Sequence, residues 1–135
     1  MLQIVYISTA RKPFSEAELQ SVLAISRRNN DAAGITGLLI SGGRRFLQAL
    51  EGPEDAVAAT FDRVRADPRH FAVVALSKKH VETREFGKWA MGFEAGGADG
   101  PDDLKGIVEA LIAPLQDKNL RAQFVGFAEI NVRAA

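Results

Sequence analysis

The stretch that most constrains the fold is the run Ile35–Gly52, ITGLLISGGRRFLQALEG. Its two apolar segments flank Gly42-Gly43, and such a pair supplies the positive φ angles of a tight turn, so the run predicts a β-hairpin. In the second strand, alternation places Phe46, Gln48 and Leu50 on one face. A buried glutamine amide must find partners or cost about 1–3 kcal/mol. Gln48 therefore either bonds to neighbouring backbone or faces a bound polar ligand.

Length and charge narrow the classes of protein that the chain can represent. Its 135 residues fit one domain with its own core. Lys+Arg and Asp+Glu balance at 17 each, which argues against a nucleic-acid or anionic-membrane partner. The absence of cysteine excludes disulfides, thiolate metal sites and cysteine nucleophiles. The sequence has neither a signal-peptide pattern nor an apolar run of membrane-spanning length, so we expect a cytoplasmic protein.

The N-terminal part predicts a strand followed by a helix. Leu2–Ser8 is short, apolar and rich in β-branched residues, and it carries the only tyrosine, Tyr6. The Ser-x-x-Glu spacing of Ser15–Glu18 is typical of a capping box at a helix start. We expect Asn29-Asn30 to end this helix, since asparagine tolerates the left-handed conformation. Asn30 also continues the inward stripe of the helix, so it is either a helix stop or a site residue.

A second helix is expected after the hairpin. Pro53 suits its first position, and Pro68 stops it. Arg63 and Asp67 lie at i,i+4 near its end. This spacing is typical of a surface ion pair, but the two side chains could also belong to a site on the inner side of the helix.

The remaining chain predicts two strands and two helices. The strands are Phe71–Leu76, bounded by solvated lysines, and Lys88–Phe93, where Trp89 and Met91 share a face. The segment 95–101 is linker-like, and amphipathic helices follow at 104–112 and 120–127.

This order predicts an α+β fold, a ferredoxin-like βαββαββ sheet with two helices on one face. The strands are apolar on both faces, so we expect the C-terminal helix pair to cover the other face.

Motifs that are absent narrow the chemistry further. The sequence contains no glycine-rich phosphate loop, no His-Glu-x-x-His and no Gly-x-Ser-x-Gly. His70 and His80 are too few for a three-histidine zinc site. The available groups are amides, one phenol, Arg63, Asp67 and His70, a set that favours hydrogen bonding to a polar heterocycle over hydrolysis.

The ordered set of these motifs resembles the BLUF domain, a flavin-binding family of blue-light sensors, over roughly residues 2–93. Each piece alone is weak, but the set in this order is specific. The pieces are Tyr6 in VYIS, Asn29-Asn30 ahead of Ile35-Thr36-Gly37, Phe46-Leu47-Gln48-Ala49-Leu50-Glu51-Gly52, Arg63, Asp67-Pro68-Arg69-His70 and Trp89-Ala90-Met91. The C-terminal helices resemble those of short, stand-alone members of the family. The resemblance implies a flavin-binding domain at 1–95 and a helical extension at 96–135, packed as one structural unit.

The resemblance implies an FAD cofactor, with FMN or riboflavin as substitutes, whose isoalloxazine ring lies between the two helices. The residues that it assigns to the flavin are Tyr6, Val22, Asn29, Asn30, Phe46, Gln48, Arg63, Val64, Asp67 and His70. Asn30 would bind the N3–H and C4=O edge and Arg63 would donate to C2=O. Val22 and Val64 would sandwich the ring from the two helices. The other side of the ring and the ribityl chain would be organised by Asp67 and His70.

The resemblance also implies a photochemical switch without catalytic turnover. Tyr6 would give an electron and a proton to the excited flavin with Gln48 as the relay, and the rearranged Gln48 amide would shift flavin absorption to the red. Trp89 and Met91 are the candidates for passing the change on, with the C-terminal helices downstream. We expect the output to be a separate signalling protein and the sensor itself to form a homo-oligomer.

Two other functions remain compatible with the residues. One is an acylphosphatase-like hydrolase with Arg11 and Asn30 as its anion site, although no phosphate-cradling loop accompanies them. The other is a small regulatory module that dimerises and has no photochemistry. A ferredoxin-like framework alone does not separate the three functions.

Overall fold

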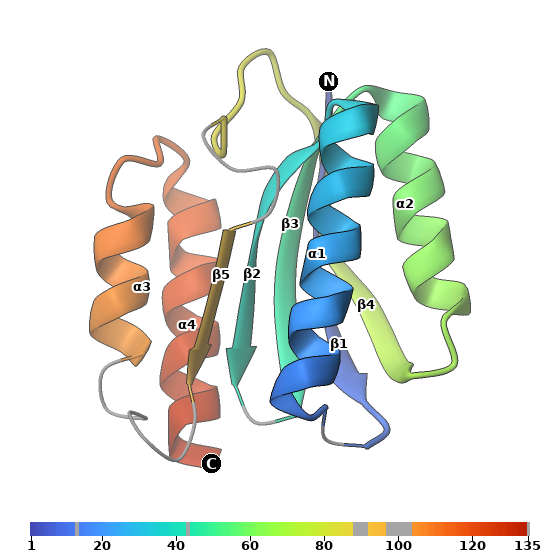
Figure 1. Ribbon diagram of the computed structural model, residues 1–135. Helices are drawn as coiled ribbons and strands as arrows, with labels where there is room; N and C mark the ends of the chain where they lie inside the picture. Colours follow the sequence, from blue (N-terminus) through green and yellow to red (C-terminus); the bar gives the residue numbers. More distant parts are fainter. Residues whose placement is uncertain (13, 43, 88–91, 97–103, 135) are drawn as a thin grey trace.

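The computed structural model describes residues 1–12, 14–42, 44–87, 92–96 and 104–134 (Figure 1). In chain order its elements are β1 (Leu2–Ala10), α1 (Glu16–Ala33), β2 (Thr36–Gly42), β3 (Arg45–Gly52), α2 (Glu54–Ala66), β4 (His70–His80), β5 (Gly92–Gly96), α3 (Leu104–Ile112) and α4 (Lys118–Ala134). Each predicted helix and strand has a counterpart in this order.

The five strands form one sheet in the order β4-β1-β3-β2-β5. The pairs β1–β3, β1–β4 and β2–β3 are antiparallel, whereas β5 runs parallel to β2. The first four strands have the ferredoxin-like order, which confirms the predicted fold class, and β5 is the added strand. Because β3 lies in the middle, Gln48 is paired with Tyr6 on one side and with Leu39 on the other.

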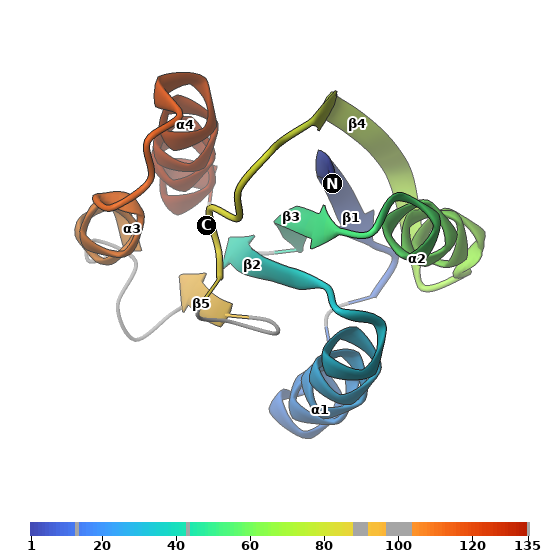
Figure 2. The ribbon, with the colours of Figure 1, turned by 90° about the horizontal axis from the view of Figure 1, so that it is seen from above.

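The two faces of the sheet carry separate apolar cores, and each is covered by a pair of helices (Figure 2). Phe46 and Leu50 belong to the core beneath α1 and α2. Leu47 and Ala49 belong to the core beneath α3 and α4. The alternation predicted for the second hairpin strand is therefore confirmed, and so is the covering role of the C-terminal helix pair.

The capping box at the start of α1 is confirmed, but the predicted end of this helix is wrong. Ser15 Oγ accepts from the Glu18 N–H at 3.1 Å, and the Glu18 carboxylate accepts from the Ser15 N–H at 3.2 Å. The helix continues past Asn29-Asn30 to Ala33 and ends at Gly34, whose φ is 73°. A glycine adopts this left-handed conformation without the steric cost of a Cβ, so the later glycine sets the end.

The strand predicted at Phe71–Leu76 is longer than expected. Strand β4 begins at His70 and pairs with β1 as far as His80, which lies opposite Leu2. Because β1 is long, its pairing with β4 extends into the lysine segment, which we expected to lie beyond the end of β4. The strand lies at the sheet edge, where lysine side chains can extend into solvent.

The hairpin and the last strand also differ from their predicted bounds. Gly42 lies within β2, paired with Arg45, and is not part of the turn. The strand predicted at Lys88–Phe93 corresponds to β5, which extends to Gly96 and into the predicted linker. Residues 88–91 lie outside the described part of the chain, and so do Trp89 and Met91.

A buried carboxylate, Glu51, cross-links the sheet on the face that the C-terminal helices cover. Glu51 is fully buried, and its Oε1 accepts from Thr36 Oγ1 at 2.9 Å and from the Phe86 N–H at 2.5 Å. Its Oε2 accepts from the Glu85 N–H at 3.0 Å and from Gln3 Nε2 at 3.3 Å. Because each carboxylate oxygen receives two donors, Glu51 ties the segment after β4 to the three central strands.

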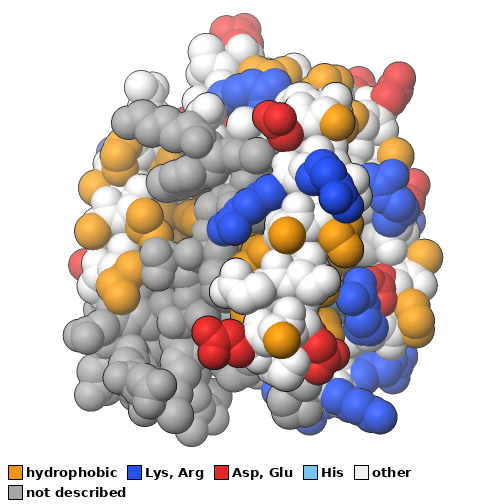
Figure 3. Space-filling model, viewed as in Figure 1, with side chains coloured by type: hydrophobic (Ala, Val, Ile, Leu, Met, Phe, Trp, Pro, Cys, Tyr) orange, Lys and Arg blue, Asp and Glu red, His pale blue; other side chains and the backbone are white. Residues whose placement is uncertain are grey.

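Charged side chains of both signs are spread over the face formed by α1 and α2 (Figure 3). At the lower right of this view, below the end of α2, Lys and Arg side chains gather. In the described part of the chain, no helix combines the length and the apolar character needed to cross a membrane.

Candidate functional site

The centre of the candidate site is a hydrogen bond between two adjacent strands. The phenol O–H of Tyr6 on β1 donates to Gln48 Oε1 on β3. Tyr6 is 1% exposed, and burial raises the pKa of its phenol well above the ordinary value. The Phe61 ring of α2 lies 5.0 Å from the Tyr6 ring, centroid to centroid. Tyr6 is thus a buried, protonated donor held against the Gln48 amide.

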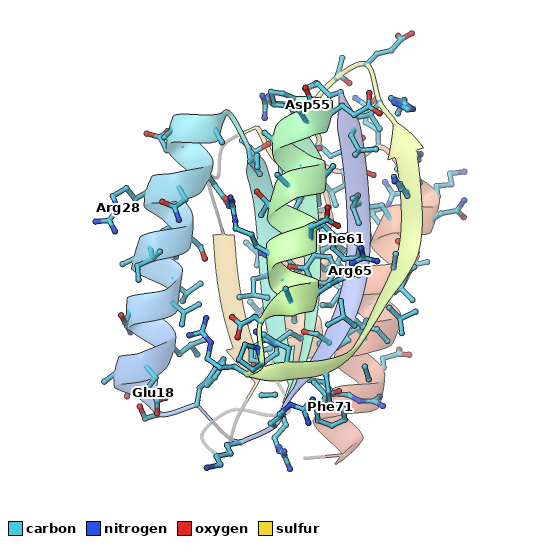
Figure 4. All side chains as sticks on the ribbon, turned by 90° about the vertical axis from the view of Figure 1, so that its right-hand side faces the viewer. Glu18, Arg28, Asp55, Phe61, Arg65 and Phe71 are labelled. Carbon is cyan, nitrogen blue, oxygen red and sulfur yellow. The ribbon has the colours of Figure 1, made fainter. Side chains whose placement is uncertain are left out.

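Above this pair, a cavity of about 210 Å³ is lined by α1, α2 and the sheet. Figure 4 shows the two helices standing side by side over the strands. All ten residues assigned to the flavin line this one cavity: Tyr6, Val22, Asn29, Asn30, Phe46, Gln48, Arg63, Val64, Asp67 and His70. The structure therefore brings the predicted set together, and its contact with a flavin stays a prediction.

Helix α1 contributes residues of its inner face, which recur at helical spacing, to the cavity wall. Leu23 and Asn30 are the buried residues of this helix, two turns apart. Asn30 is 4% exposed, whereas the neighbouring Asn29 is exposed although it also lines the cavity. Between α1 and β2, the backbone carbonyl of Asn30 accepts the Ile35 N–H at 2.8 Å. The Asn30 side chain is buried in the wall, and Asn29 lies at the outer edge.

The end of α2 supplies a cation and a carboxylate that do not pair with each other. Arg63 Nη2 donates to Thr60 Oγ1 at 3.1 Å. Asp67 instead binds Arg69, whose Nη2 lies 2.6 Å from Asp67 Oδ2 and whose backbone N–H donates to Oδ1 at 2.9 Å. The hydrogen bond from the Arg69 side chain lowers the pKa of Asp67 below its ordinary value. The surface ion pair between Arg63 and Asp67 that the spacing allowed is therefore not formed.

His70 closes the lower end of the cavity. Its Nδ1 lies 3.4 Å from Ser8 Oγ, and its ring meets Phe14 and Phe46 edge-on at 5.9 and 5.7 Å between centroids. Burial lowers the pKa of His70, and Arg69 acts in the same direction, while the Asp67 carboxylate opposes both. His70 is therefore a neutral imidazole at pH 7 and can bind through a nitrogen lone pair or an N–H.

The cavity is also lined by residues that the site prediction did not include. They are Ser8, Phe14, Leu19, Leu23, Ser26, Leu39, Leu50, Thr60 and Arg69. A sequence signal existed for Phe14: it precedes the Ser15 cap, and Leu19 lies at the fourth helical position, the spacing of a hydrophobic staple. Phe14 and Leu19 both pack against the same core cluster.

The hydrolase alternative required Arg11 and Asn30 to share an anion site, and the structure does not bring them together. Asn30 lines the cavity, whereas Arg11 lines a separate surface hollow and donates through Nε to the Pro68 carbonyl at 3.0 Å. Among the residues described, no group of three or more His, Asp or Glu side chains is placed to hold a metal ion.

The cavity fits the ring of a flavin by its chemistry. Val22 and Val64 offer apolar walls, while Asn30, Arg63 and Gln48 offer the donors and acceptors that a polar heterocycle edge requires. Its volume of about 210 Å³ is smaller than that of most small-molecule pockets, which hold about 300–1,000 Å³. It is therefore suited to a ring system, and the rest of a dinucleotide would lie outside it.

Comparison with known proteins identifies the family. The model for sensors of blue light using FAD (BLUF) matches residues 1–92. This chain belongs to the BLUF family. FAD is the cofactor that defines the family. A BLUF protein is defined by light sensing, which agrees with our interpretation of the chain as a sensor.

Curated relatives place the BLUF module in larger proteins. Photoactivated adenylate cyclase subunit alpha of Euglena gracilis is 32% identical over 120 residues, which cover 87% of this chain and 11% of the relative. The blue light- and temperature-regulated antirepressor BluF of Escherichia coli is 33% identical over 88 residues, or 65% of this chain and 22% of the relative. The chain thus spans a small part of the curated relatives that it matches.

Solved BLUF structures share the fold. BlrP1 of Klebsiella pneumoniae, solved with FMN and cyclic diGMP, has a TM-score of 0.78 and 26% identity, with 96% of this chain and 35% of that chain covered. BlrB, a BLUF protein in its dark state, has a TM-score of 0.73 and 24% identity, with 99% and 96% covered. The match with BlrB covers nearly the whole of both chains, so the fold including α3 and α4 is shared with BlrB.

Proposed function

We propose that this BLUF protein is a blue-light photoreceptor that binds FAD non-covalently between α1 and α2 and switches through Tyr6 and Gln48. The observation that carries the proposal is the hydrogen bond from the buried Tyr6 phenol to Gln48 Oε1 at the floor of the cavity. A buried donor and an amide that can reverse its donor and acceptor ends form the minimum needed for a hydrogen-bond switch.

The residues that would hold the flavin come from both helices and from the sheet. Asn30 would bind the pyrimidine edge of the ring, and Arg63 would donate to a carbonyl of the same edge. Val22 and Val64 would pack on the two faces of the ring. At the lower end of the cavity, the neutral imidazole of His70 would contact the ribityl chain, as would the Asp67 carboxylate.

The switching chemistry of the protein lies in the Tyr6–Gln48 pair. When bound, the flavin supplies blue-light absorption and an acceptor for one electron and one proton. Because burial raises the pKa of Tyr6, its phenol does not release a proton alone, and the loss of an electron is coupled to movement of the proton along the hydrogen bond to Gln48 Oε1. The Gln48 amide then rotates or tautomerises. When the electron and the proton have both returned to Tyr6, the phenol would meet a changed partner.

A structural change at Gln48 must reach the partner protein through elements that contact β3 or its neighbouring strands. Trp89 and Met91 remain our candidates for the first step. They directly precede β5 in the sequence, and β5 is separated from β3 in the sheet by β2. The C-terminal helices would be the next step, since they share a core with the far side of β3. We propose that the protein acts as a cytoplasmic homo-oligomer and signals to a separate protein, with residues 1–95 as the sensor and 96–135 as the output extension.

Absorption spectroscopy tests the proposed function directly. The purified protein should be yellow, and blue light should shift its flavin absorption to the red, with return in the dark. A sample kept in darkness throughout is the control for drift. A colourless protein that binds no added flavin would overturn the proposal, and so would a flavin-loaded protein with no light-induced difference spectrum.

A further inference from the structure

A group of three arginine–phenylalanine pairs lies where α2 ends and β4 begins. Each guanidinium carbon lies over a phenyl ring: Arg11 at 5.4 Å from Phe71, Arg65 at 5.3 Å from Phe61, and Arg69 at 5.9 Å from Phe14, each measured to the ring centroid. Figure 4 shows Phe61 and Arg65 on α2, with Phe71 below them. We call these six residues the arginine–phenylalanine cluster.

The cluster is exposed and carries an excess of positive charge. The side chains of Arg65 and Arg69 are 58% and 52% exposed, and Phe71 is 41% exposed. Four cations, Arg11, Lys12, Arg65 and Arg69, stand against three carboxylates, Asp62, Asp67 and Glu18. A guanidinium stacked on phenyl keeps its outer face and its N–H edge available, so the cluster offers both flat surfaces and donors.

The cluster adjoins the flavin cavity, because its members Phe14 and Arg69 line that cavity. A surface hollow between α2 and β4 is lined by Arg11, Arg65, Phe71 and His70, and His70 also lines the cavity. The two loops of this region are tied together, because the Arg11 N–H donates to the Arg69 carbonyl at 2.9 Å. The hollow is therefore separate from the cavity but borders its lower end at His70.

The chemistry of the hollow matches the part of FAD that the cavity cannot hold. The non-flavin half of the dinucleotide carries two phosphate charges and a planar adenine. Guanidinium groups bind phosphate through paired N–H donors and stack on planar bases. We propose that the arginine–phenylalanine cluster is the subsite for the adenosine diphosphate half of FAD, an inference that rests on flavin binding in the adjacent cavity. A free nucleotide has the same chemistry, so the test must separate the two sources.

Affinities of FAD, FMN and riboflavin for the flavin-free full-length chain test the subsite. Exposed charge pairs contribute up to about fivefold each in affinity, so the wild-type chain should bind FAD about tenfold tighter than riboflavin at low salt, with FMN between them. Raising the salt concentration should reduce this preference, because exposed charges are screened. The preference for FAD is the quantity to follow in the variants.

Three variants and one control carry the comparison. Arg65→Gln and Arg11→Gln should each weaken FAD binding about three- to fivefold and leave riboflavin binding unchanged. Asp62→Asn removes a carboxylate from the hollow and should strengthen FAD binding alone. Arg28→Gln is the control, since this exposed arginine lies on the outer side of α1, away from the hollow (Figure 4).

The outcomes separate the subsite from the proposed function. Equal affinity of the wild-type chain for FAD and riboflavin would overturn the subsite, as would an unchanged preference in both arginine variants. Failure of riboflavin itself to bind would instead count against the proposed function. ADP should compete with FAD and not with riboflavin; if ADP binds without weakening FAD, the cluster takes a free nucleotide and its assignment to FAD is wrong.

Discussion

Tyr6 and Gln48 are directly paired across the neighbouring strands β1 and β3, and the phenol of the first donates to the amide oxygen of the second. Both side chains point to the α1–α2 face, where they form the floor of the cavity. This relationship needs β1 and β3 to be neighbours, a consequence of the ferredoxin-like strand order. The first two predictions concern the two ends of this hydrogen bond.

Tyr6→Phe should retain flavin and lose the red-shifted state. The variant removes one oxygen and leaves the ring to pack against Phe61, so it should cost about 1 kcal/mol of stability. Phenylalanine cannot donate a proton with its electron, and flavin fluorescence should rise. Illumination and a difference spectrum provide the measurement, with Phe61→Leu as a control that keeps the phenol. A wild-type shift in Tyr6→Phe would reduce Tyr6 to a buried core aromatic.

Gln48→Leu should also bind flavin without a normal red shift. Leucine keeps most of the volume of glutamine, but it removes the group that accepts from Tyr6. The exposed Gln20 on α1 provides the matched control, since Gln20→Leu removes an amide outside the site. An unaltered shift in Gln48→Leu would refute the proposed role of this amide.

Asn30→Ala should weaken flavin binding more than Asn29→Ala. Asn30 is buried in the wall, so its loss leaves the polar edge of the ring unpaired at a cost of about 1–3 kcal/mol, or tenfold to a hundredfold in affinity. Asn29 is exposed, and water can replace its amide. Titration with flavin measures both variants. Equal affinities in the two variants would show that burial does not distinguish the neighbouring asparagines.

Acidification should destabilise the protein through His70. Burial holds the folded pKa of His70 below its unfolded value of 6.5, so the unfolded chain takes up the proton first as the pH falls. The stability that the neutral ring contributes is therefore complete above pH 6.5 and is lost as the pH falls toward the folded pKa. Urea unfolding between pH 7.5 and 5 measures the loss, and His70→Gln should flatten the curve in this window. The same slope in wild type and variant would assign the acid sensitivity to other groups.

Glu51→Gln should lower the free energy of unfolding by about 2–3 kcal/mol. Each carboxylate oxygen of Glu51 accepts hydrogen bonds from two groups. In the glutamine variant an NH₂ group replaces one of these oxygens. This group would face two donors and could accept from neither, whichever way the side chain is turned. Urea unfolding measures the change. Glu82→Gln, at an exposed position of the same segment, should change stability by less than about 0.5 kcal/mol. Equal stabilities of the two variants would mean that the buried network is replaceable.

The sequence by itself determined the element order and the fold class, and it predicted ten residues that the structure places around one cavity. Alternation in β3 separated Phe46 and Gln48 from Leu47, because side chains of a strand point to opposite faces whatever surrounds them. Helical spacing likewise placed Asn30 on the inner face of α1. Local periodicity was sufficient here, since each assignment depends only on neighbours along the chain.

Only the tertiary structure decided the extent of the strands and several partners. Strand β4 continues to His80 because β1 pairs with it as far as Leu2. Asp67 binds Arg69 and not Arg63, because the chain turns after α2 and brings the Arg69 side chain back to the carboxylate. The clustering of Arg11 with Phe71 joins segments sixty positions apart in the sequence. The contact between Arg11 and Phe71 depends on how the chain returns in space, and no local pattern encodes it.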